Sequence, residues 1–216
     1  MKTVAFVPIK LNNERLPGKN IRRFSNGAPL ITYILDTLLK VKEIDEIYVY
    51  CSSESICQYL PTGVKFLKRD TYLDLNTTSF NDVLTSFAEK ISADIYVLTH
   101  ATAPFISCES LKKGIKAVMN DGYDSALSVT KLQEFLWKDG VPYNYNPTMI
   151  PRTQDLPILY TETCGMYIYT KRLISIDKRR VGNNPYLVEI SKIEAIDINN
   201  EDDFILADSV FNLRRL

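Results

Sequence analysis

The chain opens with VAFVPIKLNNERLPGKN (residues 4–20), a short apolar run followed by a loop rich in cations. The first residues of this stretch have the apolar, β-branched and aromatic character of a buried strand. Lys10, Arg15 and Lys19 follow in the loop, at what would be the carboxyl end of that strand. Open α/β sheets bind ligands at that end of their strands. Fixed cations and loop amides there would suit the negative charges of a nucleoside triphosphate. The alternative is a solvated loop whose lysines have no ligand to bind. The position of the loop directly after the first strand favours a ligand site.

The loop matches neither of two common nucleotide motifs. Gly18 is its sole glycine, and no Gly-Lys-Ser/Thr sequence follows it. A Walker A loop and a dinucleotide fingerprint both need further glycines at fixed spacing. The interpretations as an ATPase or a dehydrogenase therefore lose their main support.

Short β-rich runs alternate with longer amphipathic stretches through the first part of the chain, which predicts a mostly parallel, doubly wound α/β sheet. The predicted strands cover residues 4–7, 47–51, 64–67, 95–98 and 125–129, and the predicted helices lie near residues 29–41, 54–60, 80–91 and 108–119. Residues 194–198 are predicted as a further strand, and residues 201–213 as a helix capped by Asn200 with Asp203 in a capping-box position. We expect residues 1–216 to form a single domain.

The alternating pattern stops between residues 131 and 162, where prolines interleave with aromatic residues. We interpret this segment as an irregular arm or a β-rich excursion. Such a segment could dock against a second subunit or fold back onto its own domain. A homodimer is therefore a hypothesis at this stage.

Composition excludes several classes of function. Lysine plus arginine and aspartate plus glutamate each number 26, so there is no global positive field for nucleic acid or an anionic membrane. The four cysteines form no Cys-x-x-Cys pair and there is one histidine, so neither structural zinc nor a disulfide framework is indicated. No apolar run reaches membrane-spanning length. We expect a soluble, cytoplasmic protein with no nucleic-acid or membrane partner.

The segment from Val7 to Asn20 resembles the N-terminal signature of acylneuraminate cytidylyltransferases, the CMP-sialic acid synthetases, and in part that of CMP-Kdo synthetases. Lys10 stands where that family has arginine, and Lys19 falls on its invariant lysine. The resemblance implies a nucleotide-diphospho-sugar transferase fold, GT-A-like and Rossmann-type, with a small β-rich dimerisation excursion at about residues 131–162. It also implies CTP as a substrate.

Further segments resemble the family in the same order, so the resemblance extends over nearly the whole chain. It implies catalytic roles for Lys19, Lys10 and Arg15, with the nucleotide bound by Lys10, Leu11, Asn12, Asn20, Arg69, Asn76 and Ser79. It implies an acceptor site at His100, Thr102, Arg152, Gln154 and Thr163. His100 replaces a family glutamine, and Thr163 replaces a family asparagine. Structural alternatives stay open: Arg69 could pair with Asp70 or Asp74, residues 77–79 could simply cap a helix, and His100 could be a hydrogen-bonded structural histidine.

The last matching segment contains Asp197 and Asn199, where the family has two aspartates that hold Mg²⁺. Residues spaced by two along a strand point the same way, so the predicted strand would place both side chains together. Mg²⁺ prefers oxygen ligands and keeps several waters, so Asp197 with triphosphate oxygens could hold it although Asn199 is no carboxylate.

The resemblance implies transfer of CMP from CTP to a sialic-acid-like 2-keto sugar acid, of the N-acylneuraminate, legionaminate or pseudaminate type, with release of pyrophosphate. The product would be a CMP-sugar for surface polysaccharide. A nucleotidyltransferase acting on a sugar phosphate or another small acceptor is one alternative, and a non-catalytic nucleotide-binding homologue is another.

Overall fold

A central strand organises the molecule. The computed structural model describes residues 1–213, and β1 (Thr3–Ile9) is buried along nearly its whole length. It belongs to a seven-stranded sheet of order β3-β2-β1-β4-β8-β5-β9. The other strands of the sheet are β2 (Glu46–Cys51), β3 (Val64–Lys68), β4 (Ile95–Thr99), β5 (Ser125–Leu132), β8 (Leu159–Thr170) and β9 (Pro185–Glu189). β8 runs antiparallel to β4 and β5, and the remaining neighbours pair in parallel.

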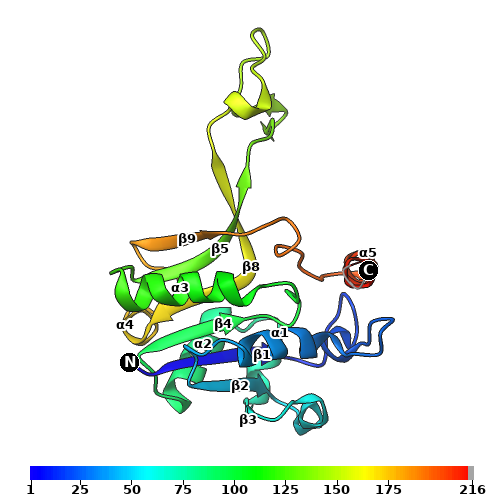
Figure 1. Cartoon of the computed structure of the whole chain (residues 1–216), viewed down its shortest axis with the longest axis vertical. Coiled ribbons are helices and arrows are strands. Elements are labelled where there is room, and N and C mark those ends of the chain that lie inside the picture. The colour runs from blue at the N-terminus through cyan, green and yellow to red at the C-terminus, as the bar shows by residue number, and fades with distance from the viewer. Residues whose placement is uncertain (214–216) are drawn as a thin grey trace.

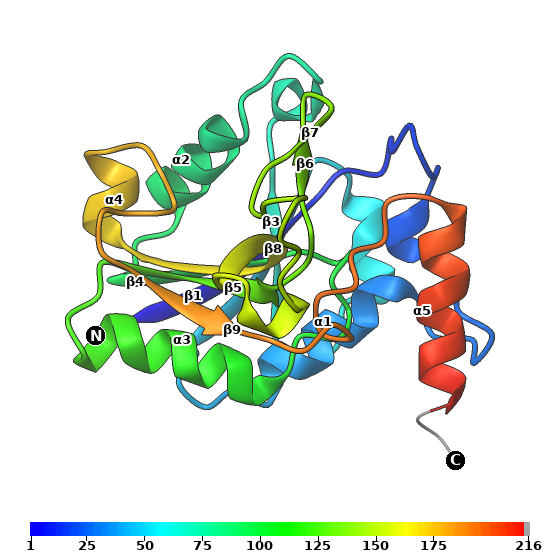
Figure 2. The ribbon, with the colours of Figure 1, turned by 90° about the horizontal axis from the view of Figure 1, so that it is seen from above.

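Helices cover both faces of this sheet (Figure 2). α1 (Leu30–Leu39) and α3 (Cys108–Asn120) pack on one face, and α2 (Phe80–Lys90) and α4 (Lys171–Ser175) pack on the other. Alternate residues of the central strands point to opposite faces, which produces two separate apolar clusters. Because both faces are covered, these strands are continuously apolar rather than alternating with polar residues. The predicted doubly wound α/β fold is confirmed.

The order of the strands places a crevice at the end of β1. β1 lies between β2 and β4, so the chain moves outward from β1 in opposite directions along the sheet. Doubly wound sheets bind ligands where such a reversal occurs, beyond the carboxyl ends of the strands. The loop that begins at Lys10 leaves β1 at this point.

The segment predicted as an arm projects from the sheet (Figure 1). β5 and β8 continue beyond it as a two-stranded ribbon, which carries the short strands β6 (Trp137–Lys138) and β7 (Val141–Pro142) and a 3-10 turn at Thr153–Asp155. The β-rich excursion is therefore confirmed, and the alternative in which the arm folds back onto its own domain is wrong for this chain. Its exposed apolar side chains include Trp137, Tyr143, Met149 and Ile150.

The predicted strand at residues 194–198 is wrong. Residues 192–195 form a turn, and the segment that follows pairs with no strand; Ile198 N donates a single backbone bond to Thr102 O at 2.8 Å. The apolar alternation of Ile196 and Ile198 instead reflects packing in a third apolar cluster, against the loop after β1 and the last helix. β9 forms one edge of the sheet and β3 the other; β8, β9 and α4 were not among the predicted elements.

The last helix, α5 (Glu201–Leu213), is confirmed together with its cap. Asp203 N donates to Asn200 Oδ1 at 3.0 Å, and Asn200 N donates to Asp203 Oδ2 at 3.0 Å, which is a reciprocal capping box. The predicted short helix near residues 54–60 is a 3-10 helix at Glu54–Tyr59. No helix within residues 1–213 has both the length and the apolar character needed to cross a bilayer.

Candidate functional site

The loop after β1 is held in one conformation by a tight turn. Gly18 has φ 67°, a left-handed conformation that favours glycine, and it precedes a 3-10 turn at Lys19–Ile21. Lys19 N donates to Leu16 O at 3.2 Å, and Asn20 Nδ2 donates to Lys10 O at 3.1 Å. These bonds close the loop on itself and aim its cations at the space beyond β1.

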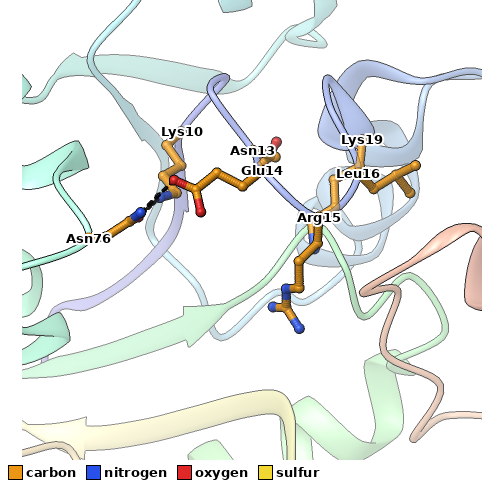
Figure 3. A pocket seen from close by; sticks show the side chains of 7 residues that line it. All are labelled: Lys10, Asn13, Glu14, Arg15, Leu16, Lys19 and Asn76. Carbon is orange, nitrogen blue, oxygen red and sulfur yellow. Dashed lines mark hydrogen bonds between the residues drawn. The ribbon is translucent and has the colours of Figure 1, made fainter.

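A cavity of about 200 Å³ lies under this loop (Figure 3). Its lining consists of Lys10, Asn13, Glu14, Arg15, Leu16, Lys19 and Asn76. The structure thus brings together Lys10, Arg15 and Lys19, as the spacing predicted. Asn76 closes one side, since its Nδ2 donates to Glu14 Oε1 at 2.5 Å while its Oδ1 accepts from Lys10 Nζ at 2.9 Å.

Lys19 is a buried cation in this wall. It is 8% exposed, and its Nζ donates to the carbonyl oxygen of Ile198 at 2.8 Å. Burial lowers the pKa of Lys19, and the nearby Asp197 carboxylate acts in the opposite direction. The bond to Ile198 ties the loop to the segment that carries the candidate metal ligands.

Asp197 and Asn199 lie side by side, although they are not on a strand. Asn199 Nδ2 donates to Asp197 Oδ2 at 2.7 Å. The other carboxylate oxygen, Asp197 Oδ1, is buried and has no hydrogen-bond partner. Within residues 1–213 no cluster of three or more His, Cys, Asp or Glu side chains could cage a metal. A single free carboxylate oxygen fits an ion that takes most of its ligands from water and phosphate, as Mg²⁺ does.

A second cavity, of about 300 Å³, adjoins the first and shares Lys10 and Asn76 with it. Pro8, Arg69, Leu73, Asp74, Leu75, Thr78, Phe80 and Val83 complete its lining. Arg69 is 4% exposed and forms an ion pair with Asp74, while its Nε is buried without a partner. The predicted alternative of a pairing with Asp74 is thus confirmed, but the pair lies in a cavity wall rather than on the surface.

His100 lies at the end of β4, close to both cavities. Its ring centroid is 5.6 Å from that of Phe80. Burial, and next the positive charge of Arg180, lower its pKa to about 4, against the attraction of Asp197. His100 is therefore neutral near pH 7 and can both donate and accept a hydrogen bond.

Several predicted residues face away from the cavities or make structural bonds. Leu11 packs against the apolar core, Asn12 is exposed, and Ser79 caps α2 by accepting from Asn81 N at 3.2 Å. Thr163 Oγ1 donates to Ser128 Oγ at 2.7 Å, at the point where the register between β5 and β8 shifts. Thr102 accepts a hydrogen bond from Ile198 N through its backbone oxygen.

Arg152 and Gln154 lie at the 3-10 turn of the arm, which projects from the sheet (Figure 1), and neither residue lines the two cavities. The Arg152 side chain is 74% exposed and donates to Asp155 at 2.8 and 3.0 Å. The structure therefore does not bring these two residues into the site formed by their own chain.

Some residues in or beside the cavities were not among the predicted site residues. Glu14 and Asn13 stand within the cationic stretch and could have been identified by position alone. No sequence motif marks Phe80 or Arg180. Phe80 reaches the site through the packing of α2, and Arg180 through the packing of the segment after α4.

Comparisons with known proteins agree with this geometry. A family model described as cytidylyltransferase matches residues 4–198. The N-acylneuraminate cytidylyltransferase A of Danio rerio is 25% identical over 214 residues, covering 94% of this chain and 49% of that protein. The CMP-N,N'-diacetyllegionaminic acid synthase of Legionella pneumophila is 25% identical over 234 residues, covering 100% of this chain and 98% of that protein. The chain thus spans about half the length of the vertebrate relatives, 49% in each.

Among solved structures, a CMP:2-keto-3-deoxy-manno-octonic acid synthetase complexed with CTP superposes with a TM-score of 0.75 at 16% identity. The match covers 99% of this chain and 100% of that one. At this identity the likeness concerns the fold.

Proposed function

This chain belongs to the cytidylyltransferase family, and from that premise we propose that it transfers CMP from CTP to a sialic-acid-like 2-keto sugar acid. The observation that carries the proposal is the pair of adjoining cavities at the end of β1. One is lined by cations and suits a triphosphate, and the other is partly apolar and suits a base. The acceptor class is that of two relatives, an N-acylneuraminate cytidylyltransferase and a CMP-N,N'-diacetyllegionaminic acid synthase.

Lys10, Arg15 and Lys19 would hold the triphosphate in the first cavity. A buried ammonium such as Lys19 interacts strongly with phosphate because little water screens it. The base would occupy the second cavity, where Arg69 and Asn76 offer polar groups beside apolar side chains such as Leu73. The shared wall of Lys10 and Asn76 would place the α-phosphate where the two cavities meet.

Asp197 would hold Mg²⁺ through its free Oδ1, with Asn199 beside it. Bound there, the ion would neutralise charge on the phosphate oxygens and lower the pKa of a hydroxyl next to it.

In the reaction, the anomeric hydroxyl oxygen of the sugar acid attacks the α-phosphorus of CTP in line. The bond from that phosphorus to the β-phosphate bridging oxygen breaks, and pyrophosphate leaves with the electron pair. The hydroxyl proton passes to solvent, because no described side chain is an evident general base. The enzyme acts by holding both reactants and by stabilising negative charge on the phosphates.

We also propose a homodimer built through the arm. Exposed aromatic and aliphatic side chains along residues 135–160 support this assembly. Docking against a second copy would bring Arg152 and Gln154 of one arm toward the cavities of the other subunit. Within their own chain the arm projects away from the sheet (Figure 1).

Pyrophosphate release with CTP and Mg²⁺ across a panel of acceptors tests the proposal. Turnover is expected with N-acetylneuraminate, legionaminate or pseudaminate, and not with sugar phosphates. Lys19→Met should lower kcat/KM for CTP by about 100-fold, because a buried donor to the phosphates is lost. Lys42→Met, at an exposed lysine outside both cavities, is the matched control. Turnover with sugar phosphates alone, or an active Lys19→Met variant, would contradict the assignment.

A further inference from the structure

Arg180 lies beside the nucleotide cavity, although it comes from the segment between α4 and β9. Its guanidinium carbon is 3.7 Å from the centroid of the Tyr167 ring and 5.3 Å from that of Phe80. Tyr167 is fully buried in β8, and Phe80 lines the proposed base cavity. The stack therefore holds the guanidinium plane against the sheet, next to the proposed base cavity.

The hydrogen-bonding capacity of this guanidinium is unused. Its nearest carboxylate is Glu162 Oε1, 3.6 Å from Nη2, which is beyond hydrogen-bond distance. That oxygen already accepts from the Tyr167 hydroxyl at 2.5 Å. Among the bonds that the structure records for residues 1–213, none is donated by Arg180, and its side chain is 26% exposed. An arginine held flat by stacking, with its N–H groups free, presents a fork that matches a carboxylate.

The surroundings of Arg180 connect it to the reacting centre. The charges of Arg180 and Asp197 both act on His100, and both also act on Cys164. His100 in turn contacts Phe80. Phe80, which contacts both the Arg180 guanidinium and the His100 ring, also lines the base cavity and so connects these groups to it. Arg180 itself lines neither proposed nucleotide cavity.

We propose that Arg180 binds the carboxylate of the acceptor sugar acid and selects acids over neutral sugars. In a 2-keto sugar acid the carboxylate is bonded to the carbon that carries the attacking hydroxyl. A residue that binds this carboxylate must therefore lie close to the reacting centre, and Arg180 contacts Phe80, which lines the base cavity and packs against His100. The Glu162 carboxylate partly neutralises the guanidinium, and its weak contact at 3.6 Å leaves the N–H groups available to the acceptor. The inference rests on the proposed function.

A purely structural role for Arg180 would require only its stacking on Tyr167. Stacking on Tyr167 would pin the segment 176–184 to the sheet without needing unfilled donors. A structural role also predicts equal losses for every substrate when Arg180 is changed. A carboxylate-binding role predicts losses confined to acceptors that carry the acid.

The experiment compares a sugar acid with its methyl ester, in the wild type and in Arg180→Gln. The wild type should favour the acid, and Arg180→Gln should raise KM for the acid by about 100-fold while leaving KM for CTP unchanged. The acid and the ester should then be nearly equivalent. Arg180→Lys keeps the charge without the fork and should give an intermediate loss. Arg172→Gln, at an exposed arginine of α4, should behave as the wild type.

Calorimetry provides a readout that does not depend on turnover. N-acetylneuraminate and its methyl ester are titrated into protein saturated with the α,β-methylene analogue of CTP. If pyrophosphate release is absent with every acid, the proposed function fails, and this titration still decides the role of Arg180. A wild type that binds acid and ester equally, an Arg180→Gln variant that still discriminates between them, or a rise in KM confined to CTP would each overturn the inference.

Discussion

Charged side chains in this site are held in place by hydrogen bonds to neighbouring groups. Lys19 is buried against Ile198 O, and Lys10 is tied to Asn76. Glu14 extends into the same cationic cavity and accepts from Asn76 (Figure 3). A carboxylate in this position partly neutralises the cations before the triphosphate arrives, and it repels the triphosphate when it does.

Removing the charge of Glu14 should improve nucleotide binding. Glu14→Gln keeps an oxygen that can accept from Asn76, so the loop should keep its shape. We expect KM for CTP to fall by about 3- to 10-fold, because repulsion near a protein surface is modest. Steady-state kinetics at low ionic strength would measure this, with Glu43→Gln as an exposed control. A rise in KM would mean that Glu14 helps to bind the nucleotide.

His100 should make stability depend on pH. Its pKa is lowered to about 4 by burial and by Arg180, whereas an unfolded histidine titrates near 6.5. Between these values the unfolded chain binds more protons, so the contribution is full above about pH 6.5 and is lost as pH falls toward 4. His100→Gln should remove this part of the pH dependence, a difference of at most about 3 kcal/mol, reduced by solvent at the partly open ring. Urea unfolding at pH 7, 5.5 and 4.5 measures it; parallel curves for both proteins would refute the assignment.

Among the elements, the arm contrasts with the rest of the molecule. The sheet and its helices bury their apolar faces, but the arm leaves Trp137, Met149 and Ile150 between 63% and 77% exposed. A ribbon of two strands has too little core to bury such residues by itself. The arm therefore suits a surface that a second copy covers.

Placing a charge on the arm should separate the subunits. Ile150→Glu puts a carboxylate in the proposed interface, where burying it without a partner is strongly unfavourable. We expect sedimentation velocity to show a dimer for the wild type and mainly monomer for this variant. KM for the acceptor should rise while KM for CTP stays the same, if the arm of a second copy completes the acceptor site. Ile176→Glu, at a residue 69% exposed just after α4, is the control; a wild-type monomer would refute the proposed assembly.

For the molecule as a whole, the proposed nucleotide site joins segments that are far apart in sequence. The loop after β1, residues 69–83 and the segment before α5 meet at one end of the sheet. A ligand that contacts all of them binds the folded chain only, so it stabilises the entire fold.

CTP with Mg²⁺ should therefore raise Tm markedly. At about 100 times Kd the stabilisation is about 2.7 kcal/mol, which corresponds to roughly 5–10 °C for a chain of this size. Asp197→Asn should lose the part of the shift that depends on Mg²⁺ and keep the part seen with CTP in EDTA. Calorimetric scans of both proteins, with and without EDTA, would measure this. A Mg²⁺-dependent shift that survives in Asp197→Asn would exclude Asp197 as the metal ligand.

Local patterns were sufficient for much of this fold. Apolar runs such as Val4 to Val7 identify buried strands because a strand covered on both faces has no polar side. The capping box of α5 is likewise local, since Asn200 and Asp203 are three residues apart. The same applies to the reaction class, which the order of the motifs indicated and the family match supports.

Local patterns could not predict three other features. These are the absence of a strand at residues 194–198, the unbonded guanidinium of Arg180 beside the site, and the separation of Arg152 from the site of its own chain. Ile196 and Ile198 alternate like a strand, but their partners are aromatic and aliphatic side chains of α5 and the β1 loop rather than a neighbouring strand. Arg180 reaches the site because Tyr167 and Phe80, distant in sequence, meet on one face of the sheet. Contacts between distant segments depend on how the helices pack on the sheet. A local pattern of residues does not determine that packing.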